Sequence, residues 1–197
     1  MRWIHVLFSG LLIFATMQCQ AKSIAPPPAN ASAVDVVKFT VAYESQAGDA
    51  SQLLRGDSMT PTPLESRLFT HDLLTGWYAT KVKESTNPDA GNVTNGDSDY
   101  IMAGGQDGPG PHDIKFKDMS NKPNGVMVLM TYKANGPYSR LFFLKQEGGA
   151  LKIDDIMSNV FIPDATPFDP NKPHHPGVSE GLRRDLVNFK SIDEGTQ

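Results

Sequence analysis

Two neighbouring aspartates stand near the end of an apolar, strand-like segment, where their residue type suits proton transfer. They are Asp154 and Asp155, within Leu151 to Met157. Because side chains alternate along a strand, we predict Asp155 on the face of Leu151 and Ile153, with Asp154 opposite. If that face lines a pocket, burial raises the pKa of Asp155 and makes it a candidate general base. The alternative, favoured by the usual exposure of carboxylates, is that the strand ends or bulges there and both aspartates are solvated.

A second group of acidic residues lies in a segment rich in Gly, Asn and Asp, residues 87–111. Clustered carboxylates can bind Ca²⁺, but the spacing here does not follow the EF-hand loop. Aspartates in such loops more often accept hydrogen bonds from nearby backbone N–H groups. We therefore predict a fixed turn and no metal ion. Five residues of this loop are candidate contacts with a binding partner: Asp97, Asp99, Tyr100, Gln106 and Asp107.

Other arrangements that would support catalysis are missing from the sequence. His174 and His175 are adjacent, but no cysteine and no third ligand stand at zinc-site spacing from them. There is no nucleophile elbow, phosphate loop or dinucleotide fingerprint. The sequence therefore predicts no cofactor and no catalytic residue, with Asp155 as the alternative.

Helical patterns dominate the first part of the chain. Apolar residues recur at helical spacing over residues 34–47 and again from Thr62 to about Glu84. The second segment begins with a capping box, in which Thr62 is the N-cap, Pro63 is the first helical residue and Glu65 is the N3 partner.

The hydrophobic period changes to that of strands after residue 112. Short turns separate four predicted strands, at residues 113–117, 126–133, 138–146 and 151–157. Five prolines within residues 160–177 predict an extended arm there, and helical spacing returns over residues 179–190. This order indicates an α+β fold, with N-terminal helices packed on a four-stranded antiparallel meander and a closing C-terminal helix.

The two middle strands of this meander are apolar on both faces. In the first of them, Val126, Val128 and Met130 alternate with Met127 and Leu129. One face must therefore pack on the helices. The other must be covered by other parts of the chain, by a partner subunit or by a ligand.

Composition limits the class of protein and its location. The chain has 197 residues, a formal net charge of -4, 39% hydrophobic residues and one cysteine. It is too apolar to be wholly disordered and not basic enough to indicate a nucleic-acid partner. Residues 1–21 have the features of a secretory signal peptide, with a positive start, an apolar run and small residues before a cleavage site at Ala21. The run is shorter than the ~20 residues of a membrane-spanning helix.

This reading gives a domain organisation. We expect a signal peptide at residues 1–21, a flexible linker at 22–33, one α+β domain at 34–190 and a tail at 191–197. The protein is then periplasmic or secreted. Two alternatives stay open, an uncleaved N-terminal anchor and acylation of Cys19 as in a bacterial lipoprotein, although the residues before Cys19 match a lipobox poorly.

The order of elements and three motifs resemble the nuclear transport factor two-like superfamily, whose members share a cone-shaped α+β fold. The motifs are Asp97-Ser98-Asp99-Tyr100, Gln106-Asp107 and the final strand from Gly149 to Ile156. Within that superfamily, the chain is similar over about residues 34–190 to an uncharacterised family of exported bacterial domains. The resemblance implies a curved sheet, but the superfamily includes enzymes, carriers and protein-binding modules, so it does not imply one function.

Two functions from different classes follow from these features. The first is an exported non-enzymatic binding protein, most concretely a periplasmic inhibitor or immunity protein against a secreted cell-wall-degrading enzyme. Export, mild acidity and the two long loops at residues 87–111 and 160–177 favour it. The alternative is a small-molecule-binding protein or proton-transfer enzyme that uses the cone as a pocket, with Asp155 as base or ligand anchor. A homodimer that buries the second sheet face also stays open.

Overall fold

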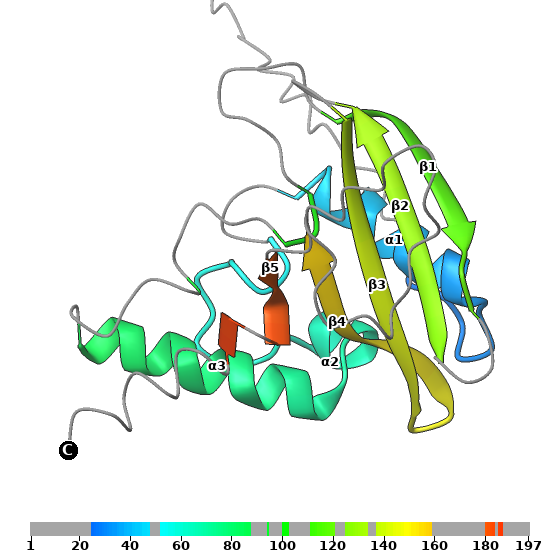
Figure 1. Cartoon of the computed structure of the whole chain (residues 1–197). Helices are drawn as coiled ribbons and strands as arrows, with labels where there is room; N and C mark the ends of the chain where they lie inside the picture. Colours follow the sequence, from blue (N-terminus) through cyan, green and yellow to red (C-terminus); the bar gives the residue numbers. More distant parts are fainter. Residues whose placement is uncertain are drawn as a thin grey trace, which may run out of the picture.

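The computed structural model of this chain describes residues 25–47, 52–87, 94, 100–102, 111–120, 125–133, 137–158, 180–183 and 185–186. Within these ranges three helices precede five strands (Figure 1). The elements are α1 (Ala33–Glu44), α2 (Pro63–Leu68), α3 (His71–Thr86), β1 (His112–Asp118), β2 (Val126–Lys133), β3 (Pro137–Glu147), β4 (Ala150–Ser158) and β5 (Glu180–Gly181). The strands form one sheet in sequence order, with antiparallel neighbours. The predicted α+β class, with helices first and a four-stranded antiparallel sheet after them, is confirmed.

Side chains just before each helix satisfy its first backbone N–H groups. Ser32 caps α1, and Thr62 caps α2 in a complete capping box with Glu65. These residue types are strongly preferred at helix N-termini because their oxygens accept from the N2 or N3 backbone N–H. The predicted capping box is therefore confirmed.

The predicted single helix from Thr62 to about Glu84 is wrong, because the chain leaves the helix at Phe69. Phe69 is extended (φ -115°, ψ 152°) and forms a parallel bridge with Ile153 of β4. The backbone N–H of Thr70 donates to the Ile153 carbonyl at 2.9 Å, and the Thr70 side chain then caps α3. Phe69 is fully buried in this position. The free energy gained by burying the Phe69 side chain against the sheet outweighs the free energy that one continuous helix would gain here.

Short turns set the register of the sheet. β3 and β4 are joined at Gly148 and Gly149, whose φ angles of 61° and 81° lie in the region that glycine adopts without strain. β2 pairs with β3 along its whole length, from Val126↔Leu144 to Lys133↔Pro137. The alternation of faces along these two strands is therefore regular.

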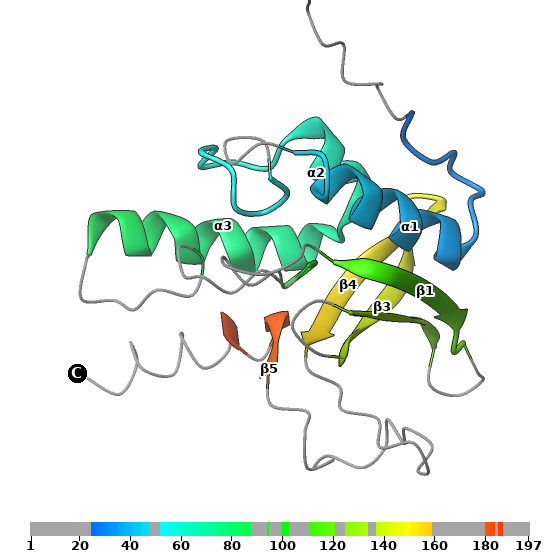
Figure 2. The ribbon, with the colours of Figure 1, turned by 90° about the horizontal axis from the view of Figure 1, so that it is seen from above.

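One face of the sheet carries the main core. Val128, Met130 and Phe142 point to this face together with buried residues of α1 and α3. α1 crosses the face over β1, β2 and β4, and α2 and α3 contact β4 (Figure 2). The predicted packing of one apolar sheet face on the helices is confirmed.

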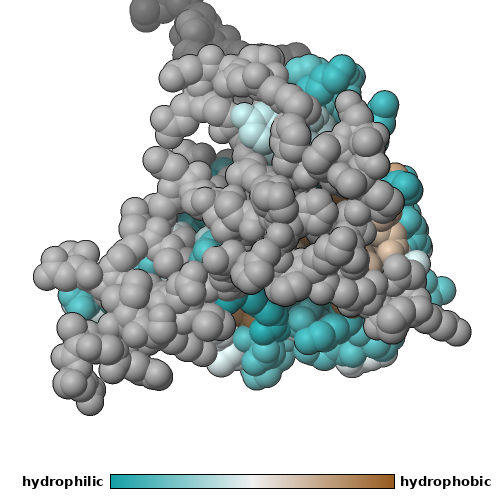
Figure 3. Space-filling view, viewed as in Figure 1, coloured by the Kyte–Doolittle hydropathy of each residue, from teal (hydrophilic) through white to brown (hydrophobic). Residues whose placement is uncertain are grey.

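The opposite surface of the sheet, here called the outer face, carries a second apolar cluster. Met127, Leu129 and Leu141 are buried there, and the partly buried Met119, Phe143 and Met157 pack around them. Figure 1 looks onto this face, with α1 behind the strands. In the same view, Figure 3 shows hydrophobic atoms near its right-hand edge, beside hydrophilic side chains.

The C-terminal part of the chain returns to β4. β5 pairs Gly181 with Met157 and Glu180 with Ser158, so two residues at the start of the predicted closing helix lie in a strand. Most of the other residues of that predicted helix, and the whole of the predicted arm at 160–177, lie outside the described residues. In the described ranges no helix is long and apolar enough to cross a membrane.

Ile153 offers a direct test of this packing, because it is fully buried and pairs with both Leu144 and Phe69. We expect Ile153→Ala to lower the free energy of unfolding by about 2–5 kcal/mol, since lost burial and a residual cavity add. Val82→Ala on α3, where the side chain is 45% exposed, is the control and should change it by less than about 0.5 kcal/mol. Urea unfolding measures both values, and equal effects would contradict the assignment of the core.

Candidate functional site

A β-bulge in β4 decides where the two aspartates lie. Leu144 of β3 pairs with Ile153, whereas the preceding Phe143 pairs with Asp155, so Asp154 is an extra residue in β4. Directly paired residues share a face, which places Asp155 with Phe143 on the outer face. The predicted position of Asp155, on the face of Leu151 and Ile153, is therefore wrong. The extra residue interrupts the alternation on which that prediction depended.

Asp154 is the centre of an ionic network that joins three elements. Its Oδ1 accepts from Thr70 Oγ1 at 2.8 Å and from Arg183 Nη2 at 2.5 Å, and its Oδ2 lies 2.7 Å from Lys145 Nζ. Arg183 also donates from Nε to the Asp154 carbonyl and from Nη1 to Asp72 Oδ2, both at 2.7 Å. The guanidinium group thus connects the C-terminal segment to β4 and to the first turn of α3.

The electrostatics of Asp154 show that this network holds a charged carboxylate. Burial acts to raise the pKa of Asp154, but the hydrogen bonds from Lys145, Thr70 and Arg183 outweigh it, and the pKa lies below its usual value. Asp154 therefore stays ionised and serves as an anchor for the closing segment.

Asp155 has a different environment. Its Oδ1 accepts from two backbone N–H groups, that of Ile156 at 2.8 Å and that of Arg183 at 3.0 Å. Within the described part of the chain, its Oδ2 makes no hydrogen bond. Burial raises the pKa of Asp155, and the two backbone hydrogen bonds and the charge of Arg183 offset this only in part. From the sequence, a raised pKa is expected only if Asp155 lines a pocket on the face of Leu151 and Ile153, whereas the burial that raises it here is on the outer face.

A pocket of about 260 Å³ opens at this carboxylate, and we call it the Asp155 pocket. Apolar side chains form one part of its wall and charged side chains form the other. Its lining residues are Gly125, Val126, Phe143, Leu144, Lys145, Asp154, Asp155, Met157 and Arg183. It can therefore hold a ligand that has both an apolar part and a polar end.

Of the five residues predicted to contact a partner, the structure describes Tyr100. Its side chain is buried, its hydroxyl donates to Asp185 Oδ2 at 2.7 Å, and its ring meets Trp77 edge-on at 5.9 Å between centroids. Tyr100 thus links its loop to the C-terminal segment and to α3. The other four, Asp97, Asp99, Gln106 and Asp107, lie outside the described residues.

Two arginines that were not among the predicted site residues, Arg140 and Arg183, organise this end of the sheet. Arg140 is 2% exposed and donates from Nε to the Tyr100 carbonyl at 3.1 Å. A charged residue directly before the apolar run at residues 141–144 is a usable signal, because a buried charge needs acceptors. Arg183 has no such signal, since it stands beside Arg184 in a segment with a polar, helical pattern.

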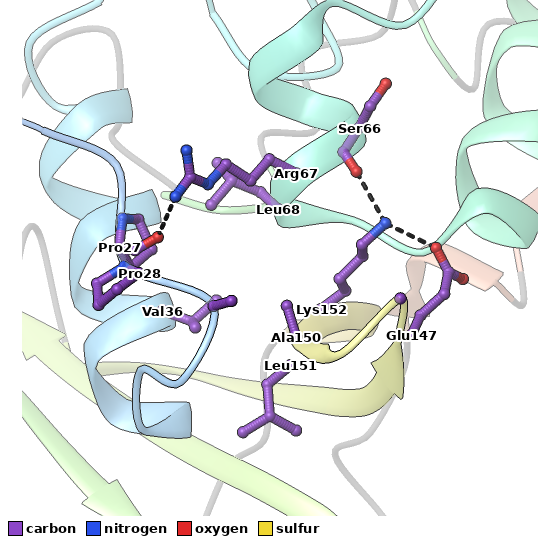
Figure 4. Close-up of a pocket in the computed structure, with 12 residues that line it drawn as sticks. Pro27, Pro28, Val36, Ser66, Arg67, Leu68, Glu147, Ala150, Leu151 and Lys152 are labelled. Carbon is purple, nitrogen blue, oxygen red and sulfur yellow. Dashed lines mark hydrogen bonds and ion pairs between the residues drawn. The ribbon is translucent and has the colours of Figure 1, made fainter.

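A second pocket, of about 300 Å³, lies between the start of α1 and the hairpin of β3 and β4 (Figure 4). Arg67 donates to the Pro27 carbonyl at 2.8 Å, which holds the segment before α1. Lys152 Nζ reaches the Ser66 carbonyl at 2.9 Å and Glu147 at 2.7 Å. These cations bind the protein's own acceptors, so the contacts here hold helices and hairpin together.

A third pocket, of about 410 Å³, is lined by Glu65 and Tyr78. Glu65 accepts from the backbone N–H groups of Leu54 at 2.6 Å and Thr62 at 2.7 Å, and from the Tyr78 hydroxyl at 2.7 Å. Burial, and then the hydrogen bond to Glu65, raise the pKa of Tyr78 far above its usual value. Tyr78 therefore remains a hydrogen-bond donor, and Glu65 fixes the loop before α2.

No group of three His, Cys, Asp or Glu side chains that could hold a metal ion occurs among the described residues. Comparisons with protein-family models, with curated proteins and with solved structures find no match for the chain. The geometry and charge of the Asp155 pocket are therefore the best indication of function.

Asp155→Asn and Asp154→Asn form a matched pair of neutralising substitutions. Asp155→Asn keeps an oxygen that accepts from the two backbone N–H groups, and it removes a charge that burial disfavours. We therefore expect the melting temperature at about pH 7 to be unchanged or higher. The second weakens three interactions with Thr70, Lys145 and Arg183, so we expect a loss of about 3 kcal/mol of unfolding free energy. Thermal and urea unfolding measure both effects.

The pH dependence follows from the directions of the two pKa shifts. The folded-state pKa of Asp155 is raised, so its stabilising contribution is complete below the unfolded-state pKa and is lost as the pH rises through the folded one. That of Asp154 is lowered, so its contribution is present at neutral pH and is lost as the pH falls through the folded pKa. The advantage of Asp155→Asn and the deficit of Asp154→Asn should therefore both shrink toward about pH 3.5. A loss of stability at neutral pH in Asp155→Asn as large as that in Asp154→Asn would contradict this account.

Proposed function

We propose that this chain is an exported, non-enzymatic binding protein, and that it acts most concretely as a periplasmic inhibitor or immunity protein against a cell-wall-degrading enzyme. The observation that carries the proposal is that the charged side chains at the Asp155 pocket bind other groups of the protein itself. Arg183 and Lys145 are bound to Asp154 and Asp72, and Asp155 Oδ1 holds two backbone N–H groups. These contacts hold the side chains around the pocket in one arrangement, which suits a pre-organised binding surface.

The pocket also offers few groups for chemistry. A proton-transfer site needs a base and an acid or electrophile that are poised to reach the same substrate. Among the described lining residues, both cationic side chains are in ion pairs with the protein's own carboxylates. What faces the pocket is an apolar wall and one carboxylate oxygen, which suits complementarity to a partner.

The sequence supports the location and finer fold within this proposal. A signal peptide at residues 1–21 would deliver the domain to the periplasm. We further propose a cone-shaped fold of the nuclear transport factor two-like superfamily, which a helix over residues 179–190 would close. In that arrangement the loops at 87–111 and 160–177 extend the surface available to a partner.

One observation favours the alternative function, in which the pocket binds a small molecule or supports proton transfer. The raised pKa of Asp155 is what a general base near neutral pH needs. Asp155→Asn distinguishes the two functions, because it would abolish turnover of a small substrate. In a binding protein it would change affinity for a protein partner and leave the partner's own activity intact.

The binding function can be tested by inhibition. The mature chain from Lys22 onward is mixed with purified secreted peptidoglycan hydrolases, including those encoded beside it, and the release of cell-wall fragments is measured. We expect stoichiometric inhibition of one hydrolase that weakens as salt increases. If no hydrolase is inhibited and native mass spectrometry shows a retained small molecule, the alternative replaces this proposal.

Charge reversal in the acidic loop gives a second test with the inhibited hydrolase. We expect Asp99→Lys combined with Asp107→Lys to lower the association rate by about tenfold at low salt, because long-range attraction to a basic partner is lost, and to have a smaller effect at high salt. Stopped-flow or surface-based kinetics measure the rate. Unchanged association at low salt would remove this loop from the interface.

A further inference from the structure

We propose that the Asp155 pocket binds a positively charged nitrogen on an apolar stem, supplied by a Lys or Arg side chain of the protein partner. The inference rests on the proposed binding function and names the chemistry of its site. Three observations carry it, namely an unmatched carboxylate, an apolar wall and a small volume.

The charges around the pocket do not balance. The cations Lys145 and Arg183 lie 2.5–2.7 Å from carboxylate oxygens of Asp154 and Asp72. None of the ion pairs in the described ranges includes Asp155. Two cations therefore face three carboxylates. The excess negative charge resides on Asp155 and favours a cationic ligand over an anionic one.

The geometry of Asp155 leaves one oxygen for a ligand. Its Oδ1 is fixed by the backbone N–H groups of Ile156 and Arg183, which hold the carboxylate in one orientation. Its Oδ2 has no such partner in the described part of the chain and belongs to a residue that lines the pocket. A carboxylate fixed in advance loses little freedom when a ligand binds, which favours affinity.

The apolar part of the wall matches an alkyl stem. Phe143 lies opposite Asp155 on β3, and Met157 lies two residues further along β4 on the same face. Val126 lines the pocket from β2. Lys and Arg bury their methylene groups along such surfaces while their charged ends bind an acceptor.

The volume of the pocket is compatible with one inserted side chain. Pockets for drug-sized ligands enclose about 300–1,000 Å³. The Asp155 pocket, at about 260 Å³, falls below that range. It is large enough for one Lys or Arg side chain, and the rest of the partner would lie on the surrounding surface.

Burial explains why a cation is preferred over a neutral donor. Burial raises the pKa of Asp155, the charge of Arg183 lowers it, and that of Asp154 raises it further. Lys145, which also lines the pocket, is paired with Asp154. A second cation at Oδ2 would favour the ionised form, whereas a neutral donor would add only one hydrogen bond. Binding of a cation at Oδ2 should accordingly lower the pKa of Asp155.

Small probes test the pocket without a partner. The isotope-labelled mature chain is titrated with n-butylammonium, n-butylguanidinium and 1-butanol, and NMR follows the Met157 methyl group and the Arg183 backbone N–H. We expect saturable shifts with the two cations and none with the alcohol at the same concentrations. Equal responses to the alcohol would overturn the inference, because they would show an apolar site without charge selection.

Two variants complete the test. Asp155→Asn should weaken binding of both cations by about tenfold or more, since the charge is lost while both backbone hydrogen bonds are kept. Asp113→Asn is the matched control, because it removes the same charge at an exposed residue of β1 that pairs with Lys133. It should leave probe binding unchanged. Equal affinity of the Asp155→Asn variant and the wild type would overturn the inference.

An inhibition assay with the protein partner separates this inference from the proposed function. With the inhibited hydrolase, Asp155→Asn should raise the inhibition constant by about tenfold, and Asp113→Asn should not. If inhibition is strong but unaffected by Asp155→Asn, the binding function stands and the inference fails. If cationic probes bind at Asp155 but no hydrolase is inhibited, the cation site stands and the proposed function, with its protein source for the cation, fails.

Discussion

Ile153 and Ile156 both face the main core although they stand three residues apart in β4. In a regular strand such residues point to opposite sides. Asp154 is the extra residue opposite Phe143, and it brings both isoleucines to the same face. The same bulge turns Asp155 to the outer face and leaves Asp154 within reach of α3 and the C-terminal segment. The positions of the charged groups at the site therefore follow from one inserted residue, which two buried isoleucines hold in place.

Arg183 links the residues of this bulge to distant parts of the chain. Its side chain bonds to Asp154 and Asp72, while its backbone N–H donates to Asp155. Removing such groups from water costs free energy, so the ion pairs are a weak argument for overall stability. Their geometry instead fixes the orientation of the C-terminal segment beside β4, while the buried Leu182 and Leu186 of that segment pack in the main core. For recognition, the fixed position of the C-terminal segment beside the pocket matters more than any gain in stability.

Local patterns were sufficient to predict part of this structure from the sequence. The capping box at Thr62, the antiparallel meander and the two apolar sheet faces follow from residue types over a few positions. The break at Phe69 does not, because it depends on a backbone pairing with β4, more than eighty residues away. The bulge at Asp154 and the reach of Arg183 likewise depend on contacts between elements. Asp155 was identified by its residue type and apolar surroundings, but its face could not be predicted once alternation was interrupted.

Asp155 is a desolvated carboxylate on the outer face, and we propose that it binds a cation. A ¹³C NMR titration of its side-chain carboxyl carbon, assigned with the Asp155→Asn variant, tests this in the chain from Lys22 onward. The account predicts a titration midpoint above the usual Asp value of about 3.9 in the free protein, and a lower midpoint in the presence of n-butylammonium. A midpoint at or below the usual value in the free protein, unchanged by the cation, would contradict it.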